Sequence, residues 1–265
     1  MAAMERFYQQ ARISGIVDSL VVRHPFFVSR RPLVFAHRGG SALAPENTMA
    51  AFDNGLAHGA DGLELDVHLS RDGGVVVHHD RTLDRTTGLR GPIADRTTGE
   101  LRAAAVPTLA DVLARHRDVR VIVELKVNSE DLARAAVDVV RKADAVDRVC
   151  FGSFGLRVLR SVRSIEPAVA TSAARDEVRW ALYRSRCRWP VTRVAYSGYQ
   201  VPELAGRTRV VSERFVNDAH RADLAVQVWT VDTEDAARRL LACGVDALIT
   251  DRPDIIVPLA RALHA

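Results

Sequence analysis

The sequence contains few cysteines and no long apolar run. Its three cysteines, Cys150, Cys187 and Cys243, are widely separated and form no Cys-x-x-Cys pair. An odd number of separated cysteines argues against a disulfide framework, so we expect small buried side chains in a reducing cytosol. No run is long enough to span a bilayer, and the N-terminus lacks the apolar segment of a signal peptide. These absences predict a cytoplasmic protein.

Lysine is scarce as well. Lys126 and Lys142 are the only two lysines, although the chain has a net charge of +4 and a pI of about 9.3. Scattered arginines supply the rest of the positive charge, and no stripe of alternating basic and aromatic residues occurs. A nucleic-acid phosphodiesterase would need such a basic track, so we expect no nucleic-acid partner. A small anionic substrate fits the charge better.

Short β-branched runs alternate with helical patterns from residue 33 onward. This alternation predicts parallel strands joined by helical crossovers. We expect helices over residues 48–58, 108–116, 130–143 and 234–243, several of them preceded by a Ser or Thr that can cap the first turn. The expected strands cover residues 33–37, 63–67, 75–79, 121–126, 149–153, 168–171, 194–201, 226–231 and 247–250.

Nine strands are one too many for an eight-stranded barrel, and the third strand explains the excess. Residues 68–74 are too few for a parallel crossover, which needs roughly a dozen or more residues, and they contain Asp72-Gly73-Gly74. We therefore expect residues 75–79 to fold back as a β-hairpin in the loop after the second strand. Eight parallel strands then remain, which predicts a (β/α)8 TIM barrel. An open doubly wound sheet is the alternative, but no Gly-x-Gly-x-x-Gly fingerprint follows the first strand.

The predicted domain organisation is an N-terminal helical extension over residues 1–30 and a single barrel domain over residues 31–265. Apolar positions between residues 13 and 21 follow helical spacing, and Pro25 ends that pattern. Such a helix could cover the barrel, or it could contact a membrane surface or a partner subunit. Residues 80–107 show no clear strand or helix and are expected to form a long loop over the site.

Ionisable residues occupy the ends of three predicted strands. His37 ends the first strand, Glu64 and Asp66 end the second, and Glu124 and Lys126 end the strand after the hairpin. In a TIM barrel the C-terminal ends of all strands meet at one mouth. Three carboxylates in one small volume remain ionised only around a cation, and oxygen ligands favour Mg²⁺ or Ca²⁺. The pattern therefore predicts a divalent metal site, although an ion network with Lys126 would also balance the charges.

Two histidines suit acid–base chemistry at this site, and together with a divalent cation they suggest metal-assisted cleavage of a phosphate ester. Cleaving a phosphodiester needs a base for the nucleophile and an acid for the leaving alkoxide, and imidazoles perform both near neutral pH. His37 is one candidate. His78 and His79 compete for the second role because successive side chains of an extended segment face opposite sides. We assign His79 to the mouth and expect His78 to be solvated. Arg38 and Lys126 are candidates for binding the phosphoryl oxygens.

The motifs, taken in order, resemble those of the glycerophosphodiester phosphodiesterase family. The resemblance covers about residues 33–254 and leaves the first thirty residues outside. It rests on His37-Arg38-Gly39, Pro45-Glu46-Asn47-Thr48, Glu64-Leu65-Asp66-Val67, Val77-His78-His79-Asp80 with Leu83 and Arg85-Thr86-Thr87, Glu124-Leu125-Lys126, Gln200-Val201-Pro202, Val228-Trp229-Thr230-Val231, Gly244-Val245-Asp246 and Thr250-Asp251-Arg252-Pro253.

The resemblance implies a TIM barrel that uses a divalent cation to hydrolyse glycerophosphodiesters to glycerol 3-phosphate and an alcohol, and so a role in glycerol and lipid metabolism. It implies that Trp229 packs against the glycerol, whereas a core position is the alternative for this side chain. The remaining roles match by position: metal ligands Glu64, Asp66 and Glu124, catalytic histidines His37 and His79, and phosphate-contacting Arg38 and Lys126.

A second enzymatic hypothesis keeps the same chemistry but changes the substrate. A lysophospholipase D-like or sphingomyelinase D-like enzyme would act on larger lipids at a membrane surface, to which it would bind peripherally. The predicted N-terminal helix and Phe26-Phe27 favour this hypothesis. A non-catalytic phosphate-binding scaffold would instead predict a damaged site, yet every expected site residue is present. The sequence gives no indication of oligomeric state.

Overall fold

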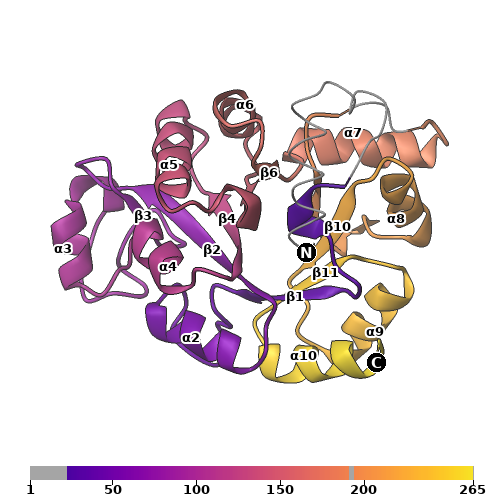
Figure 1. Cartoon of the computed structure of the whole chain (residues 1–265), viewed down its shortest axis with the longest axis horizontal. Coiled ribbons are helices and arrows are strands. Elements are labelled where there is room, and N and C mark those ends of the chain that lie inside the picture. Colours follow the sequence, from indigo (N-terminus) through magenta and orange to yellow (C-terminus); the bar gives the residue numbers. More distant parts are fainter. Residues whose placement is uncertain (1–22, 191–193, 265) are drawn as a thin grey trace.

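A computed structural model describes residues 23–190 and 194–264 of the chain. Eight parallel strands form the centre of the molecule, and helices surround them (Figure 1). The strands are β1 (Leu33–His37), β2 (Gly62–Leu69), β4 (Arg120–Leu125), β5 (Val149–Gly152), β6 (Ala170–Thr171), β7 (Gly198–Pro202), β10 (Ala225–Trp229) and β11 (Ala247–Thr250).

These strands form a nearly closed TIM barrel. Their order is β6-β5-β4-β2-β1-β11-β10-β7, so neighbours in the chain are neighbours in the sheet except where β11 returns beside β1. A parallel bridge between Ser172 and Gly198 connects β6 to β7. The fold class predicted from the alternating pattern is therefore confirmed.

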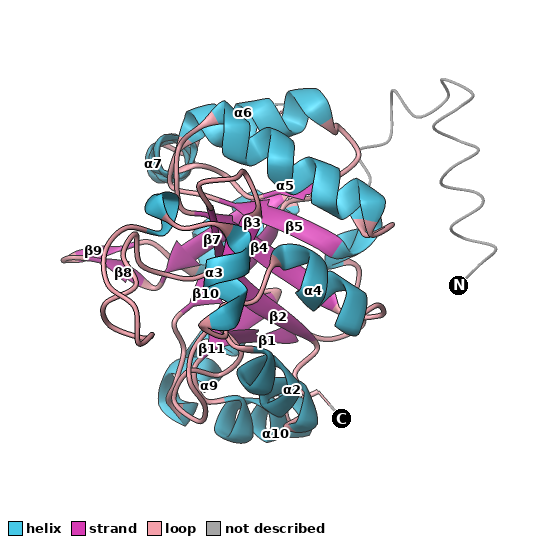
Figure 2. Cartoon of the chain, turned by 90° about the vertical axis from the view of Figure 1, so that its left-hand side faces the viewer, coloured by secondary structure: helices cyan, strands magenta, loops and turns pink. Residues whose placement is uncertain are grey.

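Helices follow most of the strands and cover the outside of the barrel (Figures 1 and 2). Their apolar faces pack on the strands, as in the buried row Leu132, Ala136 and Val140 of α5 (Glu130–Lys142). The helices are α2 (Met49–Ala57), α4 (Leu109–Arg115), α5 (Glu130–Lys142), α6 (Leu156–Ile165), α7 (Arg175–Arg186), α8 (Glu213–His220), α9 (Glu234–Ala242) and α10 (Pro253–Ala262).

The segment after β2 contains more structure than the sequence suggested. β3 (Val75–Val77) pairs antiparallel with β2. Residues 80–107, expected to lack regular structure, contain the short 3-10 helix η3 (Ile93–Asp95) and the helix α3 (Thr98–Ala103). A capping box between Thr97 and Glu100 starts α3, and this Thr-x-x-Glu signal was present in the sequence. The prediction that residues 80–107 lack regular structure was therefore wrong.

Two phenylalanines near the N-terminus lie inside the barrel. Phe26 and Phe27 belong to the 3-10 helix η2 (Pro25–Phe27) and are 1% and 4% exposed. They join a buried cluster with Phe35 of β1, and the rings of Phe26 and Phe35 stack 5.9 Å apart. Their burial corrects the expectation that this pair favours membrane contact. The predicted N-terminal helix falls almost wholly on residues 1–22, outside the described residues.

Other expectations need adjustment. Cys150 is buried as expected, but Cys187 is exposed and Cys243 is only partly buried. The strand expected over residues 194–201 begins at Gly198. No helix in the described parts of the chain is long and apolar enough to cross a membrane.

Two short strands extend one loop of the barrel. β8 (Leu204–Ala205) and β9 (Thr208–Arg209) form a small antiparallel hairpin between β7 and α8. Figure 2 shows this hairpin projecting from the barrel below α7. A further 3-10 helix, η4 (Val146–Arg148), precedes β5.

Candidate active site

The register of three adjacent strands brings the predicted site residues together. His37 of β1 pairs with Glu64 of β2, and Asp66 of β2 pairs with Glu124 of β4. Lys126 directly follows β4, and its amide donates to the Val67 carbonyl oxygen, 3.2 Å away. The parallel register therefore places these ionisable groups at one end of the barrel.

A cavity of about 780 Å³ opens at this end of the barrel. Its wall includes every residue that the sequence analysis singled out for the site. These are His37, Arg38, Glu64, Asp66, His79, Glu124, Lys126 and Trp229. Separate strand ends and the segment after β3 contribute to one cavity, so the side chains can act on one bound molecule.

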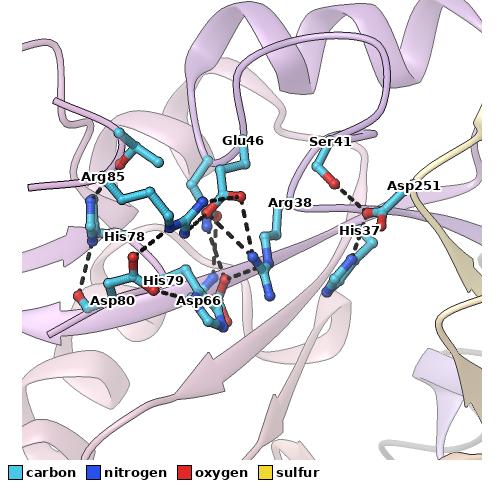
Figure 3. A network of polar contacts seen from close by, with 12 residues as sticks. His37, Arg38, Ser41, Glu46, Asp66, His78, His79, Asp80, Arg85 and Asp251 are labelled. Atoms are coloured by element: carbon cyan, nitrogen blue, oxygen red, sulfur yellow. Dashed lines mark hydrogen bonds and ion pairs between the residues drawn. The ribbon is translucent and has the colours of Figure 1, made fainter.

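His37 is held by an acidic residue from the last strand of the barrel. Its Nδ1 lies 2.7 Å from Oδ1 of Asp251, which directly follows β11 and also accepts a hydrogen bond from the Ser41 hydroxyl (Figure 3). On the other side, Nε2 lies 3.8 Å from Oε2 of Glu64. Burial disfavours the charged ring, but Glu64 and Asp251 outweigh burial and raise the pKa of His37.

Arg38 adopts an unusual backbone conformation that turns its amide inward. Its φ is +51°, and its backbone N–H donates to Oε2 of Glu64 over 3.1 Å. Gly39 follows with φ +88°, and a Cβ there would approach Ala51 of α2 to 2.7 Å. A larger residue is excluded at Gly39 by both conformation and space, so the glycine is needed for this turn.

Asp66 is surrounded by positive and polar groups. Lys126 Nζ lies 3.1 Å from Oδ1, Arg38 Nε lies 3.3 Å from Oδ2, and the Asn47 side-chain amide donates to Oδ2 over 2.9 Å. Burial alone would raise the pKa of this carboxyl, but Lys126, Arg38 and Asn47 together lower it. Asp66 is therefore ionised at neutral pH and carries a full negative charge.

Glu64 and Glu124 show the opposite behaviour. Burial, with repulsion from Asp66, raises the pKa of Glu64 to about 7. Burial raises the pKa of Glu124 to about 8, where Asp66 and Glu64 add repulsion and Lys126 only partly offsets it. Both carboxyls lack enough nearby positive charge to ionise freely at neutral pH.

The three carboxyls of Glu64, Asp66 and Glu124 are chemically suited to a hard cation, although their side chains are not arranged around a common centre. Among residues 23–190 and 194–264, no group of three or more His, Cys, Asp or Glu side chains is arranged to hold a metal ion. The Asp66 carboxylate contacts Lys126 and Arg38 instead. Three mutually repelling carboxyls remain an oxygen-ligand set of the kind that Mg²⁺ or Ca²⁺ prefers.

A chain of charged groups leads from His79 to the rim. His79 Nδ1 lies 2.7 Å from Oδ1 of Asp80, and Arg85 contacts both Asp80 and Glu46, which also contacts Arg38 (Figure 3). Burial, Lys126 and Arg38 outweigh the two nearby carboxylates and lower the pKa of His79. The two imidazoles in this cavity therefore differ in the direction of their pKa shifts.

The neighbouring histidine, His78, is buried and hydrogen-bonded within the turn. His78 is 4% exposed, so the expectation that it is solvated was wrong. Its Nδ1 lies 2.9 Å from the Asp80 carbonyl oxygen, and its Nε2 lies 2.8 Å from the Thr86 hydroxyl. His78 therefore fixes the turn that presents His79, and the alternation of side chains along the hairpin explains why only His79 reaches the cavity.

Trp229 lies at the end of β10 and is partly exposed toward the cavity. Its ring meets that of Phe154 edge to face, with centroids 6.0 Å apart. Gln200 of β7 also lines the cavity. The sequence analysis gave no role to Asp251, although His37 was identified by a similar signal, an ionisable residue at the C-terminal end of a barrel strand.

Known proteins with similar sequences and folds include glycerophosphodiester phosphodiesterases. The model of the glycerophosphoryl diester phosphodiesterase family matches residues 37–255. A glycerophosphodiester phosphodiesterase of Caldanaerobacter subterraneus is 30% identical over 258 residues, covering 87% of this chain and 98% of that protein. A probable glycerophosphodiester phosphodiesterase 2 of Mycobacterium tuberculosis is 33% identical, covering 84% and 89% of the respective chains.

A solved structure is similar along almost its whole length. The phosphodiesterase of Oleispira antarctica, in complex with the product sn-glycerol-3-phosphate, is 27% identical, with a TM-score of 0.69. The match covers 87% of this chain and 97% of that one. The similarity therefore extends over the whole barrel.

Proposed function

This chain belongs to the glycerophosphoryl diester phosphodiesterase family, and we propose that it hydrolyses glycerophosphodiesters to glycerol 3-phosphate and an alcohol. We assign the reaction to one domain, residues 31–265, and to a divalent cation assisted by two histidines. The observation that carries this proposal is the single cavity lined by His37, His79 and the three carboxyls.

Glu64, Asp66 and Glu124 are the residues that would hold the cation, Mg²⁺ or Ca²⁺. When bound, the cation supplies positive charge that favours an ionised nucleophile and screens the phosphate. It would also offset the burial and the carboxylate repulsion that raise the pKa values of Glu64 and Glu124. A cation at Asp66 would compete with Lys126 and Arg38 for the same carboxylate oxygens, leaving these basic groups available to the phosphoryl oxygens.

The two histidines divide the proton transfers. The lowered pKa of His79 supports a neutral imidazole that takes the proton from the attacking hydroxyl. Attack by a water gives glycerol 3-phosphate directly, whereas attack by the glycerol 2-hydroxyl gives a cyclic phosphate that a water then opens to glycerol 3-phosphate. The raised pKa of His37 supports an imidazolium that protonates the departing alkoxide. Asp251 and Asp80 orient the two rings through their Nδ1 atoms, and so leave Nε2 of each ring for the substrate. Trp229 is assigned to the glycerol side of the cavity.

A substrate panel with and without a chelator tests this proposal. Glycerophosphodiesters with choline, ethanolamine, glycerol, serine and inositol as alcohol are incubated with the enzyme, and glycerol 3-phosphate release is measured. We expect release from at least one of them, loss of release with a chelator, and recovery with Mg²⁺ or Ca²⁺. Release that is unchanged by exhaustive chelation would overturn the metal requirement, and no release from any substrate would overturn the proposed activity.

A further inference from the structure

The cavity continues beyond the ionisable groups into a region with apolar walls. We call this region the apolar lobe. Helix α7 forms one wall, and the end of β7 with the segment that includes β8 forms the other. Its lining residues are Val178, Leu182, Val201, Pro202, Ala205 and Val210.

The packing of the lobe leaves part of its apolar surface uncovered. Val201 and Val210 are buried in the hydrophobic cluster on this side of the barrel. Val178 and Leu182 of α7 pack against that cluster but are only partly buried, and both also line the cavity. Binding becomes more favourable when an apolar group of a ligand displaces water from such partly covered aliphatic side chains.

The size of the cavity exceeds what the reaction itself needs. Its volume is about 780 Å³, whereas pockets of roughly 300–1,000 Å³ take drug-sized ligands. A deacylated glycerophosphodiester with a small alcohol has far fewer atoms than such a ligand. Such a substrate would occupy the ionisable end and leave the lobe to water.

The distribution of polar groups indicates what the lobe can bind. Arg175 and Arg179, in the first turns of α7, are exposed residues at the edge of the cavity, and Thr208 adds a hydroxyl. The Arg175 guanidinium lies over the Phe154 ring, 4.8 Å from its centroid. A strongly polar group bound between α7 and Val201 would lose its hydration without gaining hydrogen-bond partners. A hydrocarbon chain has no hydrogen bonds to lose and avoids this cost.

We propose that the apolar lobe binds one hydrocarbon chain of the substrate, so that the preferred substrates are glycerophosphodiesters carrying a single acyl or alkyl chain. This inference rests on the proposed function, because the phosphodiester must lie at His37 and His79 for the chain to reach α7. The buried position of Phe26 and Phe27 removes one of the two earlier reasons for considering lipid substrates, and the lobe provides an independent one.

Two chain-length series test the proposal with the wild-type enzyme. Both start from the best deacylated substrate of the panel. One series carries an acyl chain on the glycerol, and the other carries an n-alkyl chain on the alcohol; all are used below their critical micelle concentrations. Each buried methylene is worth up to about fourfold in binding, so we expect kcat/KM to rise about tenfold or more by eight to ten carbons in one series. The series that responds identifies the side of the phosphate facing the lobe.

Variants with matched controls localise the effect. Ala205→Trp adds a bulky ring at an exposed residue of β8 that lines the cavity, whereas Leu204→Trp adds the same ring on the neighbouring residue, which is 52% exposed and does not line the cavity. Leu182→Gln makes the wall polar, and Tyr183→Gln is its control on α7. We expect the ratio of kcat/KM for the chain-bearing and deacylated substrates to fall about fivefold or more in the lobe variants, because several buried methylenes are lost, and to stay at the wild-type value in the controls.

The failure of this proposal differs from the failure of the proposed function. Normal hydrolysis of the deacylated substrate with no gain in either series would overturn the lobe assignment alone. A chain-length gain that the lobe variants retain would also overturn it. No hydrolysis of any substrate would instead overturn the function on which it rests.

Discussion

Nδ1 of His37 lies 2.7 Å from Oδ1 of Asp251, although the two residues are 214 positions apart in the chain. They meet because β11 returns to pair with β1, so the residue that follows the last strand lies beside the end of the first. Asp251 does not line the cavity and is therefore a positioning residue rather than a catalytic one. It fixes the orientation of the imidazole and favours its protonated form.

Replacing the Asp251 carboxylate should make His37 a less effective acid while leaving its imidazole in place. We expect Asp251→Asn to lower kcat by roughly tenfold to a hundredfold, because His37 loses part of the charge that favours its protonated form. The limb of the pH–rate profile that reports His37 should move to lower pH. Asp254→Asn, which affects a surface pair with Arg252, is the control. An unchanged profile and kcat in Asp251→Asn would contradict this role.

Removing either imidazole should abolish most of the proton transfer. We expect His37→Ala and His79→Ala each to lower kcat by about 10²–10⁴-fold while metal binding, measured by calorimetry, is retained. His58→Ala, at an exposed position at the end of α2, should behave like the wild type. Near-normal turnover in both active-site variants would exclude two-histidine catalysis.

Removing one of the three proposed ligand carboxyls should weaken the binding of the cation. We expect Glu64→Ala to weaken Mg²⁺ or Ca²⁺ binding by about tenfold or more, because affinity depends on the number of charged oxygen ligands. Excess metal should restore part of the activity. Glu130→Ala, which removes a half-exposed carboxylate paired with Arg157, is the matched control. Equal affinity in the Glu64 variant and the wild type would show that Glu64 is not a ligand.

The raised pKa values of two carboxyls predict a pH dependence for the metal-free protein. The pKa is about 7 for Glu64 and about 8 for Glu124 in the fold, against an ordinary value of 4.5. Below pH 4.5 both groups are protonated in the folded and unfolded states, and they carry no penalty. As pH rises the unfolded chain loses these protons first, so the free energy of unfolding falls until about pH 8.

Thermal unfolding checks this prediction. We expect the Tm in chelator to fall with pH across this window relative to a Glu64→Gln/Glu124→Gln double variant, whose amides do not titrate. Metal affinity of the wild type should rise over the same window, since the ligands must be ionised to bind. Identical pH profiles for the double variant and the wild type would show that the two carboxyls are ionised throughout.

The phenylalanine pair inside the barrel predicts a large effect on stability. We expect Phe26→Ala to reduce the free energy of unfolding by about 3–5 kcal/mol, because it leaves a cavity beside Phe35. Val28→Ala, at a residue that is 47% exposed, should change stability by less than about 0.5 kcal/mol. Urea denaturation measures both. A Phe26 effect as small as that of Val28 would contradict its place in the core.

Much of the site could be predicted because its residues end strands. In a parallel barrel all strand ends meet at one mouth, so the positions of His37, Glu64 and Glu124 in the sequence implied their proximity. The alternation of side chains likewise implied that only one of His78 and His79 could face the mouth, but it did not say which. The same reasoning misjudged His78, because the sequence did not reveal that the turn at Asp80 and Thr86 would bury it.

Other contacts could not be predicted because they depend on loops that fold over the mouth. Arg85 reaches Glu46 across 39 positions, and this pairing follows from the path of the segment that contains η3 and α3. The turns of that segment are set by local hydrogen bonds and caps with no hydrophobic period, which is why it was expected to be a plain loop.

The alternation of strands and helices, the number of parallel strands and the residues at the strand ends could all be predicted from the sequence, because apolar periodicity and helix caps are local properties of a chain. Three features required the folded chain: the contact of Asp251 with His37, the packing of Phe26 and Phe27 against Phe35, and the apolar lobe between α7 and the segment after β7. These features arise between residues far apart in the chain, and they depend on closure of the barrel and on the packing of its loops.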